Sequence, residues 1–180
     1  MKFIGSHNEK LWQLCIETGA IQLPINLNEP STFRLNKICQ FPPFCRKVAF
    51  EIVSHFLDQD VQVVTTTSPE SILLVAEVAR QLEARILMPS VHLLPDSSFA
   101  LQNPFELHSG DRIIVIESVV REKTPVISSL FRTILTANAR LIGIGSWIDF
   151  KSSSRLLNIR QVSAFRIDDT EKNGNYDRNL

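Results

Sequence analysis

The clearest chemical feature of the sequence is a run of hydroxyl side chains where an apolar segment meets the start of a helix. Thr65, Thr66, Thr67 and Ser68 follow one another directly, and Pro69 comes next. A serine before a proline favours a first helical turn, because serine can cap free backbone N–H groups and proline lacks one. Four hydroxyls near a helix start could bind an anion. The simpler interpretation, which we favour, is a polar turn in which Ser68 caps the helix.

A second polar segment follows the most apolar run of the chain and covers residues 117–124. It begins with an acid, Glu117, and contains two cations, Arg121 and Lys123, which could attract an anion. It ends at Thr124-Pro125, which repeats the helix-start pattern. We favour capping as the only role of this threonine.

The remaining reactive side chains form no recognisable site. The four histidines are widely separated, and the three cysteines contain no CxxC pair, so neither a zinc site nor a disulfide framework is indicated. We therefore expect no metal site. The cysteines are interpreted as small buried apolar side chains rather than nucleophiles, and they are Cys15, Cys39 and Cys45.

Length and composition restrict the class of protein. The chain has 180 residues, with 19 basic and 19 acidic side chains, and 44% of its residues are hydrophobic. These values predict one globular domain and give no electrostatic case for nucleic acid or a membrane surface. No signal peptide or membrane span is recognised, so a cytoplasmic location is expected. The six glycines are about 3% of the chain, against a usual share of roughly 7%, which argues against a glycine-rich phosphate loop.

Strand and helix patterns alternate from about residue 61 to 149. Strands are expected at 61–65, 84–88, 112–118, 139–149 and 161–167, and one more could cover 33–39. Helices are expected at 8–19, 44–57, 68–81 and 124–138, with a short one at 152–158. Residues 89–110 contain three prolines and are expected to be irregular.

This alternation predicts an α/β fold in which a parallel sheet has helices on both faces. The N-terminal helix and the extended pieces after it are expected to pack elsewhere, as a small subdomain with the last strand. Ligands of such sheets bind beyond the carboxyl ends of the strands. Function is therefore expected in the loops at 65–70, 89–110, 117–124 and 149–154.

The segment 108–149 resembles the core of the type I phosphoribosyltransferases, and orotate phosphoribosyltransferase most of all. The matching features are the Gly110-Asp111 lead-in, the apolar strand at 112–116, and then Glu117, Val119 and Val120. Further similarity to the family's first helix, hood segment and closing strand lies at 11–23, 31–38 and 162–169. The resemblance therefore covers about residues 11–169.

The resemblance implies a parallel sheet flanked by helices, with a small hood formed from both ends of the chain. The expected organisation is a single domain over residues 1–170, followed by a polar tail at 171–180 that is expected to be flexible. Within the domain, the hood is expected from about 20–42 and 160–168, and the core from about 44–158.

In this family, two carboxylates at the end of a strand bind the ribose hydroxyls and the Mg²⁺ shell of phosphoribosyl pyrophosphate. Threonine hydroxyls and glycine N–H groups next to them hold the 5′-phosphate. Here Glu117 keeps the first acid, but Ser118 replaces the second. Bulkier residues, Arg121, Lys123 and Thr124, stand where threonine, small residues or glycine belong. The resemblance thus implies a degenerate loop, in which these five residues remain candidates for binding an anion.

Three other functional segments of the family also differ. The pyrophosphate loop, usually small residues and glycine, is here the hydroxyl run 65–68. The stretch 88–107, at the position of the cationic mobile loop, contains no Lys or Arg, so it lacks the charges that stabilise a leaving pyrophosphate. In the base pocket, Phe150 stands where an arginine is usual. The family has two aromatic residues before an asparagine of the hood; here these two are Arg34 and Leu35, and the asparagine is kept as Asn36.

The first hypothesis is therefore a phosphoribosyltransferase-like protein that has lost catalysis and binds a metabolite or a partner. It has no assigned catalytic residue, metal or cofactor. The alternative is an active divergent enzyme that uses Mg²⁺ and transfers phosphoribosyl to a pyrimidine or related base. A third possibility is an unrelated doubly wound protein. The family's two-fold dimers imply a homodimer, a small anionic metabolite is a possible ligand, and neither nucleic acid nor a membrane is an expected partner.

Overall fold

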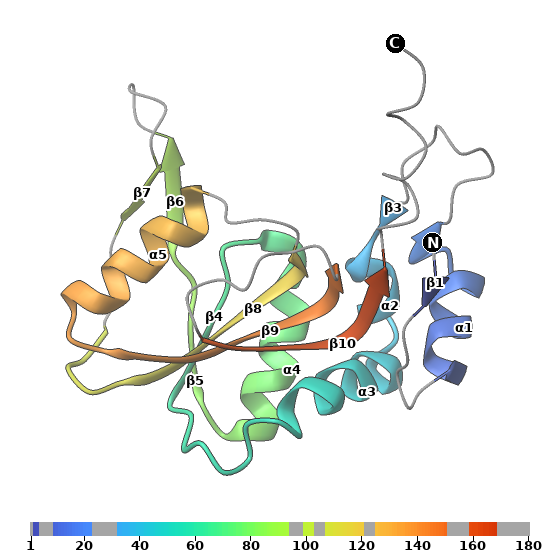
Figure 1. The fold of residues 1–180 in the computed structure, drawn as a ribbon, viewed down its shortest axis with the longest axis horizontal. Helices are drawn as coiled ribbons and strands as arrows, with labels where there is room; N and C mark the ends of the chain where they lie inside the picture. Colours follow the sequence, from blue (N-terminus) through green and yellow to red (C-terminus); the bar gives the residue numbers. More distant parts are fainter. Residues whose placement is uncertain are drawn as a thin grey trace.

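A computed structural model describes residues 2–3, 9–22, 32–93, 99–102, 107–120, 125–150 and 159–168 (Figure 1). Its centre is a six-stranded sheet with the order β1-β10-β9-β8-β4-β5. The short β1 (Lys2–Phe3) pairs antiparallel with its neighbour, and the other five strands are parallel. These five are β4 (Val63–Thr65), β5 (Arg85–Leu87), β8 (Arg112–Val120), β9 (Arg140–Phe150) and β10 (Arg160–Asp168).

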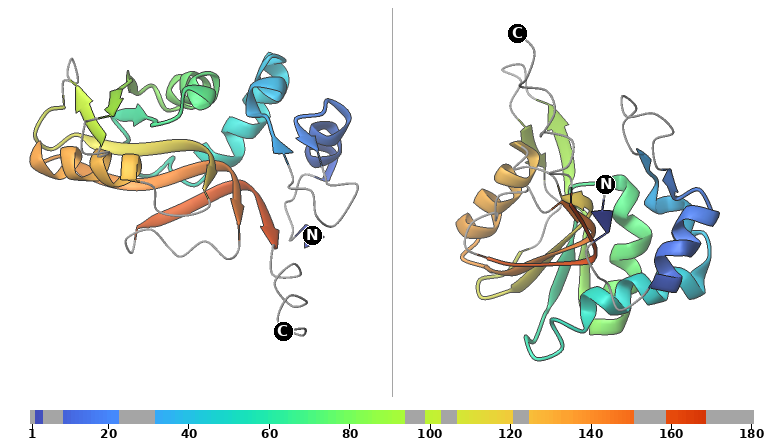
Figure 2. Two further views of the ribbon diagram at one scale, coloured as in Figure 1. Left: turned by 90° about the horizontal axis from the view of Figure 1, so that it is seen from above. Right: turned by 45° about the vertical axis from the view of Figure 1, so that its right-hand side comes forward.

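Helices cover both faces of this sheet, as the alternating pattern predicts (Figure 2). On one face lie α3 (Pro42–Val53) and α4 (Ile72–Leu82), and on the other lies α5 (Pro125–Thr136). The two cores meet in the central strand β8, because successive strand residues point to opposite faces. Ile114 and Ile116 belong to the core under α3 and α4, whereas Ile113 and Val115 belong to the core under α5. A strand buried on both faces must be apolar throughout, which explains the unbroken run at 113–116.

Two glycines of β9 let α3 and the turn after it pack directly on the sheet. A Cβ atom at Gly143 would lie 2.6 Å from the ring of Phe56, and one at Gly145 would lie 2.5 Å from Cγ2 of Ile52. Both distances are too short for any side chain, so β9 requires glycine at these positions.

An ion pair joins β5 to β8 at the amino end of the strands. Asp111 is buried and accepts two hydrogen bonds from Nη2 of Arg85, at 2.9 and 2.7 Å, and a third from the backbone N–H of His108 at 2.7 Å. Gly110 precedes it with a φ of +88°, a conformation that glycine adopts without strain. The Gly-Asp lead-in therefore has a structural role, at the end of the sheet opposite to the expected ligand edge.

The N-terminal part of the chain forms a smaller unit against α3. It contains α1 (Glu9–Glu17), a two-stranded antiparallel sheet of β2 (Ile21–Gln22) and β3 (Thr32–Phe33), and α2 (Leu35–Cys39). The strand expected at 33–39 is therefore wrong. The segment follows helical spacing instead, since Leu35, Ile38 and Cys39 are the residues that it buries.

Two further expectations need correction. Residues 89–110 are not wholly irregular, because β6 (Ser90–Leu93) pairs antiparallel with β7 (Phe99–Gln102). The last strand, expected in the hood at 160–168, is β10 of the main sheet and runs parallel to β9. The short helix expected at 152–158 and the tail at 171–180 lie outside the described residues. Within the described part of the chain, no helix is both long enough and apolar enough to cross a membrane.

Candidate functional site

The hydroxyl run and Glu117 come together at the carboxyl ends of β4 and β8. These strands are adjacent and parallel, with Thr65 beside Val115 in the register. Glu117 lies two residues further along β8, level with the turn that follows β4. The topology thus brings together two segments that are 50 residues apart in the sequence.

Glu117 is bound by the turn that it faces. Its side chain is 5% exposed, and its Oε1 accepts one hydrogen bond from the backbone N–H of Thr67 and one from its hydroxyl, both at 2.8 Å. Burial raises the pKa of Glu117 above its ordinary value, while hydrogen bonds from Thr67 and Thr66 oppose this effect without cancelling it. The one acid retained in the degenerate loop is therefore shifted toward its protonated form and engaged by its own chain.

The turn itself is held by Thr66 rather than by Ser68. The buried hydroxyl of Thr66 accepts a hydrogen bond from the backbone N–H of Ser68 at 3.0 Å. Ser68 precedes the short 3-10 helix η1 (Pro69–Ser71), but its side chain makes no capping hydrogen bond, so its expected capping role is wrong. Because a hydroxyl two residues earlier already engages the N–H of Ser68, the turn closes locally.

Two further hydroxyls of this turn are buried without a partner. Thr65 Oγ1 and Ser71 Oγ make no hydrogen bond among the described residues, although both residues are fully buried. An unpaired buried hydroxyl costs about 1–3 kcal/mol. Because both residues are 0% exposed, a ligand recovers part of that free energy only where the turn opens to admit it, and in this sense the turn is a candidate binding element.

The donor groups here do not suit Mg²⁺, the ion that the family resemblance implies. Mg²⁺ prefers ionised carboxylates, but Glu117 is shifted toward its protonated form and Ser118 offers only a hydroxyl. Among the described residues, no three His, Cys, Asp or Glu side chains gather in a way that could hold a metal.

Of the five loop candidates, the structure describes two. Glu117 lies beside the turn at 65–68, and the half-buried Ser118 follows it on β8. Arg121, Lys123 and Thr124 lie outside the described residues. Within the described residues, the candidate site therefore consists of the turn at 65–68 and the end of β8.

The base-pocket position is filled by apolar packing. Phe150 ends β9, is buried, and meets the ring of Phe33 edge to face at 5.7 Å. Arg34 and Asn36 follow in the chain and are exposed. Two aromatic rings thus pack together at the position where the family places a cationic anchor.

A cation near this position comes from β10, a strand that the sequence predicts but in which Arg166 was not singled out as a site residue. Arg166 of β10 pairs with Asp149 of β9, with its Nη2 3.3 Å from Oδ2 of the buried carboxylate. The two residues are partners in the parallel register of β9 and β10. Aligning these strands in the sequence would have placed Arg166 beside the Asp that ends the fourth strand.

A surface hollow elsewhere does not belong to this site. It has a volume of about 460 Å³ and lies between α3 and α4. None of the candidate residues lines it. Its lining consists of Arg46, Lys47, Phe50, Glu51, Arg80 and Gln81.

Comparison with known proteins agrees with this topology. No protein-family model matches the chain. Orotate phosphoribosyltransferase of Desulforamulus reducens is 23% identical over 159 residues, which cover 86% of this chain and 81% of that protein. Orotate phosphoribosyltransferase of Caldanaerobacter subterraneus subsp. tengcongensis is 26% identical over 134 residues, which cover 74% of this chain and 68% of that protein.

Solved structures show the same fold. Adenine phosphoribosyltransferase of Thermoanaerobacter pseudethanolicus superposes with a TM-score of 0.68 at 8% identity, over 86% of this chain and 99% of that chain. UMP synthase of Leishmania donovani superposes with a TM-score of 0.68 at 12% identity, over 90% of this chain and 37% of that longer chain. At these identities the likeness concerns the fold alone. From the fold and the sequence similarity together, the chain is a relative of the type I phosphoribosyltransferases, and its sequence resemblance is to the orotate phosphoribosyltransferases.

Proposed function

We propose that this phosphoribosyltransferase-like protein is catalytically inactive and binds a small anionic metabolite at the turn 65–71. The observation that carries the proposal is the contact of Glu117 with Thr67 at 2.8 Å. Thr67 lies at the position of the family's pyrophosphate loop, and Glu117 lies at the position of its phosphoribosyl pyrophosphate loop. In this chain the two positions bind each other.

A working site would need this acid for its substrate. A carboxylate that binds ribose hydroxyls must be ionised and must point its oxygen atoms at the ligand. In this chain Glu117 is 5% exposed, its pKa is raised by burial, and Oε1 already accepts two hydrogen bonds. With Ser118 in place of the second acid, the strand end no longer offers a pair of ionised carboxylates.

The charges that would stabilise a leaving pyrophosphate are also missing. Residues 88–107 contain no Lys or Arg, and Arg166, which lies near the base-pocket position, is paired with the buried Asp149 at 3.3 Å. Fixed positive charge at the leaving group is usually among the largest contributions to such catalysis. A site without it is suited to binding rather than to group transfer.

Hydroxyls and a helix start favour an anion as the ligand class. The unpaired hydroxyls of Thr65 and Ser71 lie on either side of the turn that starts η1 and α4. The dipole at the start of a helix favours negative charge, although the N–H groups of Thr67 and Ser68 are already engaged by Glu117 and Thr66. The sequence that follows β8 contains two cations, Arg121 and Lys123, with the acid Glu122 between them, a net charge of one positive unit that favours an anion.

The test combines binding and turnover with the full chain. Phosphoribosyl pyrophosphate, pyrophosphate and inorganic phosphate, each with and without Mg²⁺, are titrated by calorimetry and by thermal shift. Pyrophosphate release is then measured with orotate and with uracil. We expect binding of at least one of these anions without a requirement for Mg²⁺, and no release above the protein-free rate. Release of pyrophosphate with either base would refute the proposed inactivity, and failure of all three probes to bind would refute the anionic ligand.

A matched pair of variants locates the binding site. Thr65→Val removes an unpaired buried hydroxyl with little change of shape, and we expect it to weaken anion binding about threefold or more, the loss of one modest hydrogen bond. Thr136→Val is the control, because that hydroxyl bonds the carbonyl of Arg132 on α5, on the other face of the sheet. Equal affinities of the two variants would place the ligand elsewhere.

The alternative function, an active divergent phosphoribosyltransferase, rests on one observation: an acid and a hydroxyl-rich turn still meet at the strand ends. The pyrophosphate-release assay decides between the two functions. We further propose a homodimer, in keeping with the family, and light scattering of the purified chain tests this state directly.

A further inference from the structure

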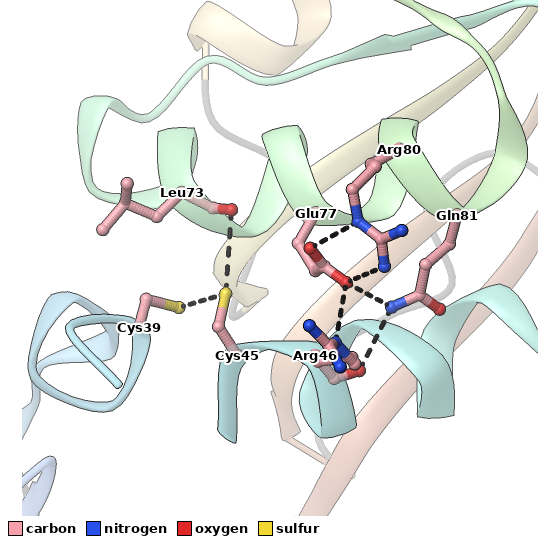
Figure 3. Close-up of polar contacts among 7 residues, drawn as sticks. All are labelled: Cys39, Cys45, Arg46, Leu73, Glu77, Arg80 and Gln81. Atoms are coloured by element: carbon pink, nitrogen blue, oxygen red, sulfur yellow. Dashed lines mark hydrogen bonds and ion pairs between the residues drawn. The ribbon is translucent and has the colours of Figure 1, made fainter. Parts of the chain in front are cut away.

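Two of the three cysteines lie in contact at the corner between α2 and α3 (Figure 3). Cys39 is the last residue of α2 and Cys45 lies in the first turns of α3, and their sulfur atoms are 3.1 Å apart. They are six positions apart and form no familiar cysteine motif. The pair arises only because the chain turns sharply between the two helices.

The pair is buried. Cys39 is 6% exposed and Cys45 is 5% exposed, so a second protein cannot approach the sulfur atoms closely, and a small peroxide is the kind of oxidant that suits the site. Cys15 is 0% exposed, and burial raises its pKa to about 12, which keeps that thiol protonated at neutral pH.

The contact also makes the two thiols unequal. The side-chain hydrogen bond between the two thiols lowers the pKa of Cys45, although burial and the nearby Glu77 of α4 oppose this effect. The same contact and burial raise the pKa of Cys39. Cys45 is therefore the thiol that more readily becomes the thiolate, and Cys39 is positioned next to it as a second thiol.

We propose that Cys39 and Cys45 are an oxidative modification site, which a peroxide converts to an intramolecular disulfide. The thiolate of Cys45 attacks one peroxide oxygen, the O–O bond breaks, and hydroxide leaves and takes up the proton that Cys45 released, forming water. This gives a sulfenic acid. The sulfur of Cys39 then attacks the sulfenic sulfur, the S–O bond breaks, and the hydroxyl leaves as a second water with the proton of Cys39. The two thiols lose two electrons and two protons, and the peroxide is reduced to two waters.

Little movement is needed for this reaction. A disulfide requires a sulfur–sulfur distance of about 2.05 Å, so the two atoms must approach each other by about 1 Å. The closed ring fastens the end of α2 to α3 and fixes the corner that carries Phe41 and Phe44. Because α2 also carries Asn36 of the base-pocket position, oxidation restrains that helix as well.

The experiment uses the full chain and mass spectrometry. Reduced protein is treated with excess hydrogen peroxide, then quenched in denaturant with N-ethylmaleimide and digested with trypsin. Cleavage after Lys37 and Arg46 places both cysteines in one peptide, residues 38–46, while Cys15 falls in another. We expect the 38–46 peptide to lose two hydrogens and to carry no maleimide, and to carry two after reduction. The Cys15 peptide should carry one maleimide throughout.

Variants and stability complete the test. Cys45→Ala and Cys39→Ala should abolish the loss of two hydrogens, and Cys15→Ala, the matched control, should leave it unchanged. Oxidation should raise the Tm of the wild-type chain by about 5–10 °C, because even a short closed loop restricts the unfolded chain. If the 38–46 peptide keeps both maleimides after peroxide, or if a cross-link to Cys15 forms instead, the proposal is overturned, and this result depends on the wild-type protein alone.

Discussion

Replacement of Glu117 by glutamine should change how the stability of the protein depends on pH. Glutamine has the shape of a protonated glutamate, and its carbonyl oxygen can accept both hydrogen bonds from Thr67 at the place of Oε1. The variant therefore keeps the contact and removes only the titration. Any difference between wild type and Glu117→Gln then reports the protonation of one buried carboxyl.

The sign follows from the direction of the shift. Burial raises the pKa of Glu117 in the folded state above the ordinary value of 4.5, so in the pH range just above 4.5 the folded protein holds a proton that the unfolded chain has lost. Raising the pH through this range stabilises the unfolded state. The free energy of unfolding of the wild type should fall relative to the variant, with a slope of at most about 1.4 kcal/mol per pH unit. Above the raised pKa of the folded state the difference becomes constant.

Urea unfolding measures this difference, with the fluorescence of the two tryptophans, Trp12 and the buried Trp147, as the signal. Curves are recorded from pH 4.5 to 8 for wild type, for Glu117→Gln and for Glu70→Gln. The last variant removes an exposed carboxyl from the same turn and controls for the loss of one acidic side chain. If wild type and Glu117→Gln have parallel stability profiles over this range, burial does not raise the pKa of Glu117 in the folded protein.

Three further outcomes follow from the structure. Gly145→Ala should lower the free energy of unfolding by about 1–3 kcal/mol in urea, because the new methyl group would lie 2.5 Å from Ile52. Asp111→Asn should cost about 1–3 kcal/mol in the same assay, since it breaks the paired hydrogen bonds to Arg85, and no loss would show that the pair is dispensable. Ser118→Asp alone should produce no pyrophosphate release with orotate, because the cationic loop is also missing, and recovered turnover would contradict the proposed inactivity.

Much of the fold could be predicted from the sequence, because strands buried on both faces leave an unambiguous pattern. The apolar run at 113–116 and the Gly-Asp before it indicate the central strand and its lead-in, and both are found. The secondary structure of segments of only a few residues is harder to predict. Residues 33–39 suit alternation and helical spacing equally well, and packing against α3 selects the helix.

The sequence could predict which segments of the candidate site lie next to each other, but not which side chains bond. Parallel strands with neighbouring carboxyl ends must bring the turn after β4 close to Glu117. Turn geometry, which sequence patterns do not specify, decides that the hydroxyl of Thr67 bonds the acid. It also decides that Thr66 closes the turn, whereas Ser68, the expected helix cap, makes no capping hydrogen bond. Arg166 was missed for a related reason, since its partner depends on the register between two strands.

Glycine is present where the fold needs it for packing and absent where the family resemblance places it for binding phosphate. At Gly143 and Gly145 the sheet and α3 lie so close that no side chain fits, and glycine is present. Where the resemblance places small residues or glycine against a phosphate, the chain has Lys123 and Thr124 instead. If the fold were no longer under selection, larger side chains would be expected at Gly143 and Gly145 of β9, because glycine there serves only packing. This chain meets the packing requirement and not the phosphate requirement, which is the pattern expected when a binding role preserves the fold and the original transfer reaction no longer constrains its loops.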